Sequence, residues 1–419
     1  MAVVAAAAAV IAVTACSAGS QPATDRSAPP ASAPGRAASS APAPAAPVTV
    51  TVRAPGCSTA TATAPALRTV PAPMAPVPST PFGVAVTADG RWSFVALTGS
   101  GSVGVFRAQG PGVPSLARQV HTGGQPLGEA LTRDGRYLLV ADGGSGAAVI
   151  SVSRAEQGEA GALLGTLSAP TGSGAIEVAA SPDGRFAFVS LEDSASIAVF
   201  DLQQALTRGF GAADFVGTIP AGLAPVGMAV SPDGRWLYAT SELELGARPS
   251  PGLLSGEGTL TVISLRRAET DPATSVVSTV QAGCSPVRVI TSADGGVVWV
   301  TARGSDRLLG FSAARLLTDP AQSIVASVKV GEAPVGLALV DGGTRIVVAN
   351  SNRFGAPGAA SSLAVVNVAA ALASRPALAG YLPAGGFPRE MALEPDGRTL
   401  LVGNFTSQQL EAVGVAGLP

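Results

Sequence analysis

The chain has 419 residues, enough for one large domain or for two or three smaller ones. Glycine (51 residues) and proline (34) make up about a fifth of it, which disfavours a long helical bundle and favours many short strands joined by tight turns. The formal net charge of −2 excludes a broad basic surface for nucleic acid.

Residues 1–15 are predicted to be a secretion signal. Residues 2–13 form an apolar run that is too short to span a bilayer and has the length of a signal peptide's hydrophobic region. The run ends in Val-Thr-Ala-Cys, which resembles the lipobox of bacterial lipoproteins, so Cys16 would carry the lipid. An ordinary signal peptide with an incidental cysteine is the alternative, and the lack of Lys or Arg before Arg26 departs from the lipoprotein pattern.

Residues 16–65 are predicted to be a tether. Between residues 27 and 47, all but two residues are Ala, Ser or Pro. Such a segment has almost no bulky apolar side chain to bury, and its prolines keep it semi-extended. No other apolar run reaches transmembrane length without charges or breakers. We therefore expect an extracytoplasmic protein, at the cell surface or in the periplasm, that contacts the membrane only through its lipid anchor.

Residues 66–419 contain seven copies of one repeat. Each copy has an apolar strand, a turn containing Asp-Gly, a second apolar strand and, in most copies, a third strand after a polar loop. In two copies a second glycine follows Asp-Gly. The first two strands of the copies lie at 81–97, 126–142, 174–190, 225–241, 286–302, 334–350 and 387–404. The turn aspartates are 45 to 61 residues apart, and the longest interval contains an insertion at 242–258. A blade of four short strands needs ~40–50 residues, so the pattern predicts an all-β, seven-bladed β-propeller of four-stranded blades.

Local features complete the predicted ring. Ser-Pro-Asp-Gly is suited to a type I turn. A fourth strand precedes each new copy, as at 215–222, and residues 203–209 and 313–319 are expected to form helical turns outside the blades. The seventh copy supplies only three strands. We expect residues 66–70 to add the missing outer strand, so that an N-terminal strand closes the ring in the last blade and removes two free sheet edges.

The repeat unit Pro-x-Gly-x-Ala-x-Ser-Pro-Asp-Gly-Arg, followed after the second strand by Val-x-Val-Ile-Asp, resembles the YVTN-type repeat of the YncE-like and lactonase-like propeller families. The resemblance covers residues 66–419 in seven copies. It implies the propeller fold, whereas proteins of that superfamily include enzymes, electron carriers and binding proteins.

The sequence offers little for cofactor or nucleophile chemistry. Cys57 and Cys284 either form a disulfide that pins the segment before the first blade, or remain free thiols. There is no CxxCH, no CxxC and no histidine cluster, so we expect no cofactor and no haem or zinc site. The only histidine, His121, lies on the outer strand of the first copy and is expected to be a surface or packing residue.

Aligning the copies on the turn aspartate locates a candidate ligand site. Six residues earlier the repeat has glycine, with a one-residue shift in the sixth copy, but three copies carry Glu177, Arg288 and Glu390 instead. This position begins the innermost strand, at the rim of the central channel. Further candidates lie beside it or on the loops after the second strands: Glu129, Arg389, Asp142, Glu192, Arg303 and Asn350.

Two interpretations of these charges remain open. They form a polar ligand site at the channel mouth, or Glu177, Arg288 and Glu390 form a structural ion-pair ring that fills the channel. The first leads to a monomeric, non-catalytic binding module at the cell envelope, whose partner is an unknown small ligand or envelope protein. The alternative function is a lactonase-like hydrolase, with a carboxylate as general base and an arginine for the oxyanion. A carboxylate-rich mouth could also hold Ca²⁺.

Overall fold

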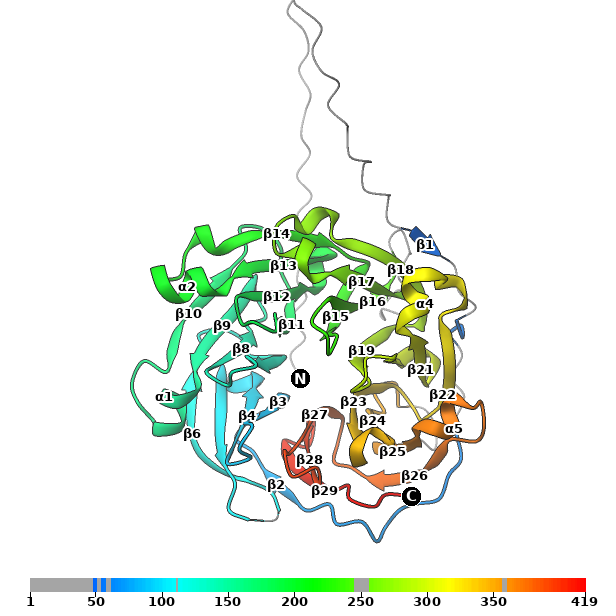
Figure 1. Cartoon of the computed structure of the whole chain (residues 1–419). Helices are drawn as coiled ribbons and strands as arrows, with labels where there is room; N and C mark the ends of the chain where they lie inside the picture. Colours follow the sequence, from blue (N-terminus) through cyan, green and yellow to red (C-terminus); the bar gives the residue numbers. More distant parts are fainter. Residues whose placement is uncertain (1–47, 51–53, 58–61, 111, 245–255, 356–359) are drawn as a thin grey trace, which may run out of the picture. The chain divides into compact units, whose positions relative to one another are not determined.

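Seven sheets stand around one axis and form a closed ring, and each contains four antiparallel strands (Figure 1). The computed structural model describes residues 48–50, 54–57, 62–110, 112–244, 256–355 and 360–419, all within the compact unit 46–419. The predicted signal, Cys16 and most of the insertion at 242–258 lie outside the described residues. The predicted seven-bladed propeller is confirmed. No helix in the described part of the chain is long and apolar enough to cross a membrane.

The strands of each blade follow one another from the axis outward. Blade one has β3 (Pro81–Val86), β4 (Trp92–Leu97), β5 (Ser102–Arg107) and β6 (Ser115–His121), and blade two has β7 (Glu129–Leu131), β8 (Tyr137–Ala141), β9 (Gly146–Ser151) and β10 (Leu163–Ser168). Blade three has β11 (Ala175–Ala180), β12 (Phe186–Leu191), β13 (Ser196–Asp201) and β14 (Phe215–Pro220), and blade four has β15 (Leu223–Val230), β16 (Trp236–Leu243), β17 (Glu257–Ser264) and β18 (Val276–Cys284). Blade five has β19 (Pro286–Thr291), β20 (Val297–Ala302), β21 (Arg307–Ser312) and β22 (Ile324–Lys329), and blade six has β23 (Pro334–Val340), β24 (Arg345–Asn350), β25 (Ser362–Asn367) and β26 (Leu378–Pro383). Blade seven has β27 (Pro388–Leu393), β28 (Thr399–Asn404), β29 (Gln409–Gly414) and, as its outer strand, β2 (Met74–Pro76).

Short helices connect the third and fourth strands of blades two to six. They are α1 (Val152–Gln157), α2 (Leu202–Arg208), α3 (Leu265–Ala268), α4 (Ala313–Thr318) and α5 (Val368–Leu372). Side-chain oxygens cap three of them, as where Asp201 accepts from the amide of Gln204 at 2.8 Å. The helical turns predicted near 203–209 and 313–319 are confirmed as α2 and α4.

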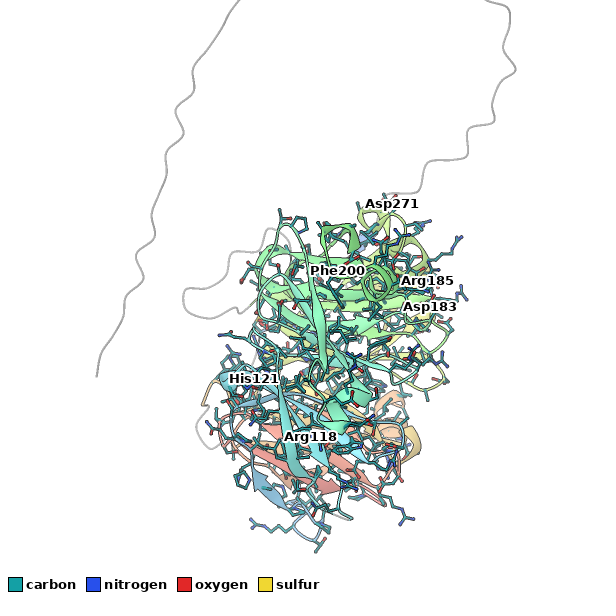
Figure 2. All side chains as sticks on the ribbon, turned by 90° about the vertical axis from the view of Figure 1, so that its left-hand side faces the viewer. Arg118, His121, Asp183, Arg185, Phe200 and Asp271 are labelled. Carbon is teal, nitrogen blue, oxygen red and sulfur yellow. A yellow bond between two sulfur atoms is a disulfide. The ribbon has the colours of Figure 1, made fainter. Side chains whose placement is uncertain are left out.

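The Asp-Gly turns join the first two strands of each blade. In blade four the amide of Gly234, at φ 70°, donates to the carbonyl of Ser231 at 2.9 Å. Asp233 Oδ1 accepts from the Ser231 hydroxyl at 2.6 Å and from the amide of Arg235 at 3.1 Å. The side chain therefore satisfies turn donors in the way the sequence indicates. Figure 2 views the ring edge-on, with Asp183 and Arg185 of the blade-three turn at one face and His121 toward the other.

The apolar core lies between neighbouring blades. Phe94 and Val103 of blade one, for example, pack in one buried cluster with Leu138 and Ile150 of blade two. A comparable cluster of described residues lies at each of the other six junctions, including that of blade seven with blade one. Each blade thus buries both faces against its neighbours, which suits the nearly continuous apolar strands of the repeat.

An N-terminal strand closes the ring as predicted, but the expectation that residues 66–70 form it was wrong. The strand that pairs with β29 is β2, Met74–Pro76. The segment 71–76 is rich in proline, which has no amide hydrogen to donate. An outer strand needs partners on one side only, so proline is tolerated there, and the carbonyls of Pro71 and Pro73 accept from Gly414 and Ala412 at 2.8 and 2.9 Å.

The chain before β2 runs along the outer edges of blades four to six, and we call residues 48–50, 54–57 and 62–70 the belt. Its strand β1 (Val48–Val50) pairs in parallel with β18 (Figure 1). A disulfide joins Cys57 to Cys284, and Ala66 forms a parallel bridge with Tyr381 of β26. Most of these belt residues were expected in the tether. The structure places them against the ring.

Candidate functional site

Glycine begins the inner strand in four blades because the next blade approaches closely there. A β-carbon at Gly336 would lie 1.9 Å from the carbonyl oxygen of Arg389, and one at Gly227 would lie 2.3 Å from that of Val287. A β-carbon at Gly128 would lie 2.4 Å from Oε1 of Glu177. The glycines of blades two, four and six thus make room for the charged residue at the same position of the following blade.

The charged residues of blades three, five and seven meet in one cluster. Arg288 Nε lies 3.3 Å from Oε2 of Glu177 and donates to Oε1 of Glu390. Its Nη1 also donates to the carbonyl of Val226 at 3.3 Å. The side chains of Arg288, Glu177 and Glu390 are 6%, 12% and 18% exposed. The structure therefore brings together the three residues that the sequence singled out, with the arginine between the two carboxylates.

Burial sets the protonation of this cluster. Burial raises the pKa of Glu177 to about 8, an effect that Arg288 opposes and Glu390 strengthens. Burial also raises the pKa of Glu129 well above its usual range; the backbone of Ala85 opposes this effect, and Glu177 adds to it. For Arg288, burial alone would lower the pKa, but Glu390 and Glu177 raise it. Glu177 is therefore largely protonated at neutral pH, while Arg288 remains a cation.

Arg389 lies in an aromatic frame beside this cluster. Its guanidinium carbon is 3.6 Å from the ring centroid of Phe82, 5.6 Å from that of Phe387 and 5.5 Å from that of Phe405. No described carboxylate lies within 4 Å of the guanidinium nitrogens. Burial lowers its pKa to about 9, and repulsion from Arg288 adds to the effect. Arg389 is thus a partly desolvated cation without a close ion-pair partner among the described residues.

A second ion pair joins Glu242, near the end of β16, to Arg303, which directly follows β20. Arg303 Nη2 is 2.5 Å from Oε2 of Glu242, and both side chains are almost fully buried. Burial raises the pKa of Glu192, as do Glu242 and Asp193, while Arg389 and Arg303 lower it. Glu192 therefore interacts electrostatically with both the second pair and Arg389.

Two of the predicted site residues have local roles instead. Asp142 Oδ1 accepts from the amides of Gly144 at 2.8 Å and Gly146 at 3.2 Å, which holds its own loop. Asn350 is fully buried, and its Nδ2 donates to Ser362 Oγ at 3.1 Å. Asp142 thus holds its own loop, and Asn350 Nδ2 also donates to the carbonyl of Val330, which follows β22 of blade five, at 3.4 Å.

The apolar residues beside the charges were missed by the sequence reasoning. Phe82, Ile176, Val226, Val287 and Val335 come from five blades, yet they form one buried cluster, so they meet at the axis. Each stands immediately before the glycine or charged position of its copy, and in the seventh copy that place is taken by Arg389. This column of the repeat alignment was the available signal for an arginine set among apolar side chains.

The remaining candidates lie away from the axis. His121 is exposed on β6, where its Nδ1 lies 2.9 Å from Ser102 Oγ, in agreement with the predicted surface position. Within the described ranges, no group of three or more His, Cys, Asp or Glu residues is placed to hold a metal ion.

Comparison with known proteins supports the fold and gives a family. The family described as "Lactonase, 7-bladed beta-propeller" matches residues 60–313, about three fifths of the chain. No curated protein matches the chain in sequence. A chain of hydrazine synthase from Kuenenia stuttgartiensis is similar in structure, with a TM-score of 0.63 and 17% identity over 82% of this chain and 98% of that one. A chain of a mitotic checkpoint complex has a TM-score of 0.62 and 15% identity over 82% and 94%. At these identities, the similarity extends to the fold alone.

Proposed function

This chain belongs to the lactonase family of seven-bladed β-propellers, and we propose that it is a non-catalytic member, which binds a small organic anion at the mouth of its channel. The protein would act outside the cytoplasm, held at the cell envelope by a lipid on Cys16. The alternative within the same family is hydrolysis of a lactone.

The pairing of Arg288 with Glu177 and Glu390 carries the proposal. A hydrolase of this kind needs a carboxylate free to take a proton and a cation free to stabilise the oxyanion. Here the central arginine, Arg288, is engaged by two carboxyl groups, and the free cation beside it, Arg389, lies among phenyl rings with no described carboxylate at salt-bridge distance to serve as a base. Burial raises the pKa of Glu177 to about 8, so most of this carboxyl is protonated at neutral pH, and Glu390 accepts a hydrogen bond from Arg288. The cluster is therefore better suited to shaping the mouth than to catalysing hydrolysis.

Arg389 is the group that favours an anionic ligand. Its guanidinium has no close carboxylate among the described residues, and Phe82, Phe387 and Phe405 frame it. A carboxylate would gain a charge-assisted hydrogen bond there, and the apolar body of the ligand would contact the phenyl rings. An aryl or alkyl carboxylate matches this combination better than a neutral sugar does.

The envelope location is supported by two independent features. Val-Thr-Ala-Cys follows the apolar run at the N-terminus. Cys57 and Cys284 form a disulfide, and disulfides persist mainly in oxidising compartments outside the cytoplasm. Phase separation in detergent tests the anchor: the full chain should enter the detergent phase, and the Cys16→Ser variant should not. Retention of that variant in the detergent phase would contradict lipidation at Cys16.

Calorimetric titration with phenylacetate tests the ligand site, with benzyl alcohol as the neutral probe. We expect phenylacetate to bind, benzyl alcohol not to bind, and Arg389→Met to weaken binding at least about tenfold, which corresponds to about 1.4 kcal/mol. Arg398→Met, at an exposed arginine on the turn of the same blade, is the matched control and should bind normally. Hydrolysis of a lactone above the uncatalysed rate, lost in Glu390→Gln, would instead establish the lactonase alternative.

A further inference from the structure

A pocket of about 190 Å³ lies at the opposite end of the ring from the mouth, between blades four and five. Asp233, Trp236 and Tyr238 of blade four form one side of it, and Asp294 of the blade-five turn and Leu317 of α4 form the other. These residues belong to the turn end, so the pocket is separate from the charged cluster on the inner strands.

The pocket coincides with a break in the repeat. In blades one to four and in blade seven, arginine follows Asp-Gly, whereas blade five has Gly296. Asp89 and Asp233 each have the neighbouring arginine within salt-bridge distance, at 2.6 and 3.8 Å. Asp294 has no such arginine. Its Oδ1 accepts from Ser292 and from the amide of Gly296, while its Oδ2 makes no hydrogen bond to another described residue.

The helix that covers the pocket, α4, presents an apolar side chain to it. The fifth residue from the start of α1 is Glu156, which interacts electrostatically with Asp89 and Arg91 of the preceding blade. The corresponding residue after α3 is Glu269, which interacts with Asp183 and Arg185 in the same way. In α4 this place is taken by Leu317. The junction of blades four and five therefore has an apolar wall. Leucine also stands at this place in α2 (Leu206) and α5 (Leu372), whereas glutamate does so only in α1 and after α3.

The polar groups that line the pocket beside Trp236 include three hydrogen-bond acceptors, Asp233, Asp294 and the Tyr238 hydroxyl. The hydroxyl of Ser292 lowers the pKa of Asp294, and that of Ser231 lowers the pKa of Asp233, so both are carboxylates at neutral pH. Burial raises the pKa of Tyr238 to about 12, which keeps its hydroxyl intact. That hydroxyl has no hydrogen-bond partner among the described residues. With Arg235 as the adjacent cation, the two carboxylates leave a net charge of −1 at the pocket.

We propose that this pocket binds a primary alkylammonium group, presented either by a lysine side chain of a partner protein or by a free diamine. An ammonium group has three N–H donors, and Asp233, Asp294 and the Tyr238 hydroxyl supply three acceptors. Trp236, whose ring has the Arg235 guanidinium carbon 5.6 Å from its centroid, and Leu317 would contact the methylene chain. An anion would be repelled by the net charge of −1, and a neutral sugar would leave that charge without a partner.

Calorimetric titration of the full chain with Nα-acetyl-lysinamide tests this site. We expect saturable binding that weakens at least about tenfold in Asp294→Asn, about 1.4 kcal/mol, and weakens also in Trp236→Ala. Asp183→Asn is the matched control, because it removes the same turn carboxylate in blade three, outside the pocket. The Nε-acetylated probe, which has lost its charge, should not bind.

Two further probes separate the sources and the chemistry. Tighter binding of cadaverine than of the lysine probe indicates a free diamine, and tighter binding of a lysine-containing peptide indicates a protein partner. The Nε-trimethylated lysine probe has no N–H donors and should bind more weakly than the lysine probe. Equal affinity of the trimethylated probe, unchanged binding in Asp294→Asn, or no saturable binding of any ammonium probe would overturn the proposal.

Discussion

The two ends of the inner strands are built in different ways. At the turn end, most blades use the same arrangement, in which an aspartate accepts hydrogen bonds from a preceding Ser or Thr and from the following backbone. At the mouth end, neighbouring blades differ, because glycines of blades two, four and six stand against Glu177, Arg288 and Glu390 of blades three, five and seven. The repeated residues form exposed turns whose hydrogen bonds stay within each turn. The residues that depart from the repeat bring charged side chains together at the axis.

The electrostatic consequences are opposite as well. At the turn end, the Thr87 hydroxyl and the Arg91 backbone lower the pKa of Asp89 to about 2. At the mouth, burial raises the pKa of Glu177 to about 8. The turns therefore stabilise a charged carboxylate and the mouth stabilises a protonated one, so the two ends should respond differently to mutation and to pH.

The largest expected difference follows removal of Arg288. Arg288→Ala leaves Glu390 buried without its cation and removes the guanidinium beside the largely protonated Glu177, and should lower the free energy of unfolding by about 3–5 kcal/mol. Arg398→Ala, at an exposed turn position, should change it by no more than about 0.5 kcal/mol. Urea denaturation measures both. A small effect of Arg288→Ala would mean that the mouth is hydrated and that its charges are available to ligands.

The pH dependence of stability should separate the two ends next. Glu177 has a raised pKa in the folded state, so its contribution is complete below the unfolded value near 4.5 and is lost as the pH rises through about 8, on the order of a few kcal/mol. Asp89 has a lowered pKa, so its contribution is present above about 3.8 and is lost as the pH falls through about 2. Denaturation between pH 5 and 9 should show stability falling with pH.

Glu177→Gln isolates the contribution of the mouth to that slope. The variant keeps the size of the side chain but cannot titrate, so the fall between pH 5 and 9 should be smaller. It should not vanish, because burial also raises the pKa of Glu129 and raises that of Glu411 to about 7. An unchanged slope in Glu177→Gln would show that Glu177 titrates normally in the folded protein.

Crowding at the mouth gives a smaller effect. Gly336→Ala places a β-carbon against the carbonyl of Arg389, and the backbone of blade seven must shift to accept it. We expect a loss of about 1–3 kcal/mol. Gly211→Ala is the control, because it lies in extended backbone with no heavy atom within 4 Å of the added carbon. Equal melting temperatures of the two variants would contradict the packing argument.

The same contrast explains how much the sequence predicts. The blades, the turns and the glycine column follow from periodicity, because each repeats seven times and each has a local physical cause. The meeting of Glu177, Arg288 and Glu390 follows from their shared place in the repeat. The aromatic frame of Arg389 did not follow, since Phe387 and Phe405 lie in loops outside the aligned columns. The closing strand β2 was also misplaced, because edge pairing by a proline-rich segment uses carbonyls and leaves no apolar pattern.

The smallest predicted effect tests whether the turns of different blades contribute independently to the free energy of unfolding. Ser231→Ala removes the hydroxyl that donates to Asp233 and accepts from the amide of Trp236 at 3.0 Å. The turn is partly open to water, which can replace these hydrogen bonds, so we expect a loss of only about 0.5–1.5 kcal/mol. Ser181→Ala and Thr87→Ala change the equivalent position in two other blades, and their effects should be similar in size and additive with it, because no described hydrogen bond joins the three turns. Urea denaturation of the single and triple variants measures this. A triple variant that loses much more than the sum would show that the turn end is cooperative after all, and would remove the distinction drawn between the two ends of the ring.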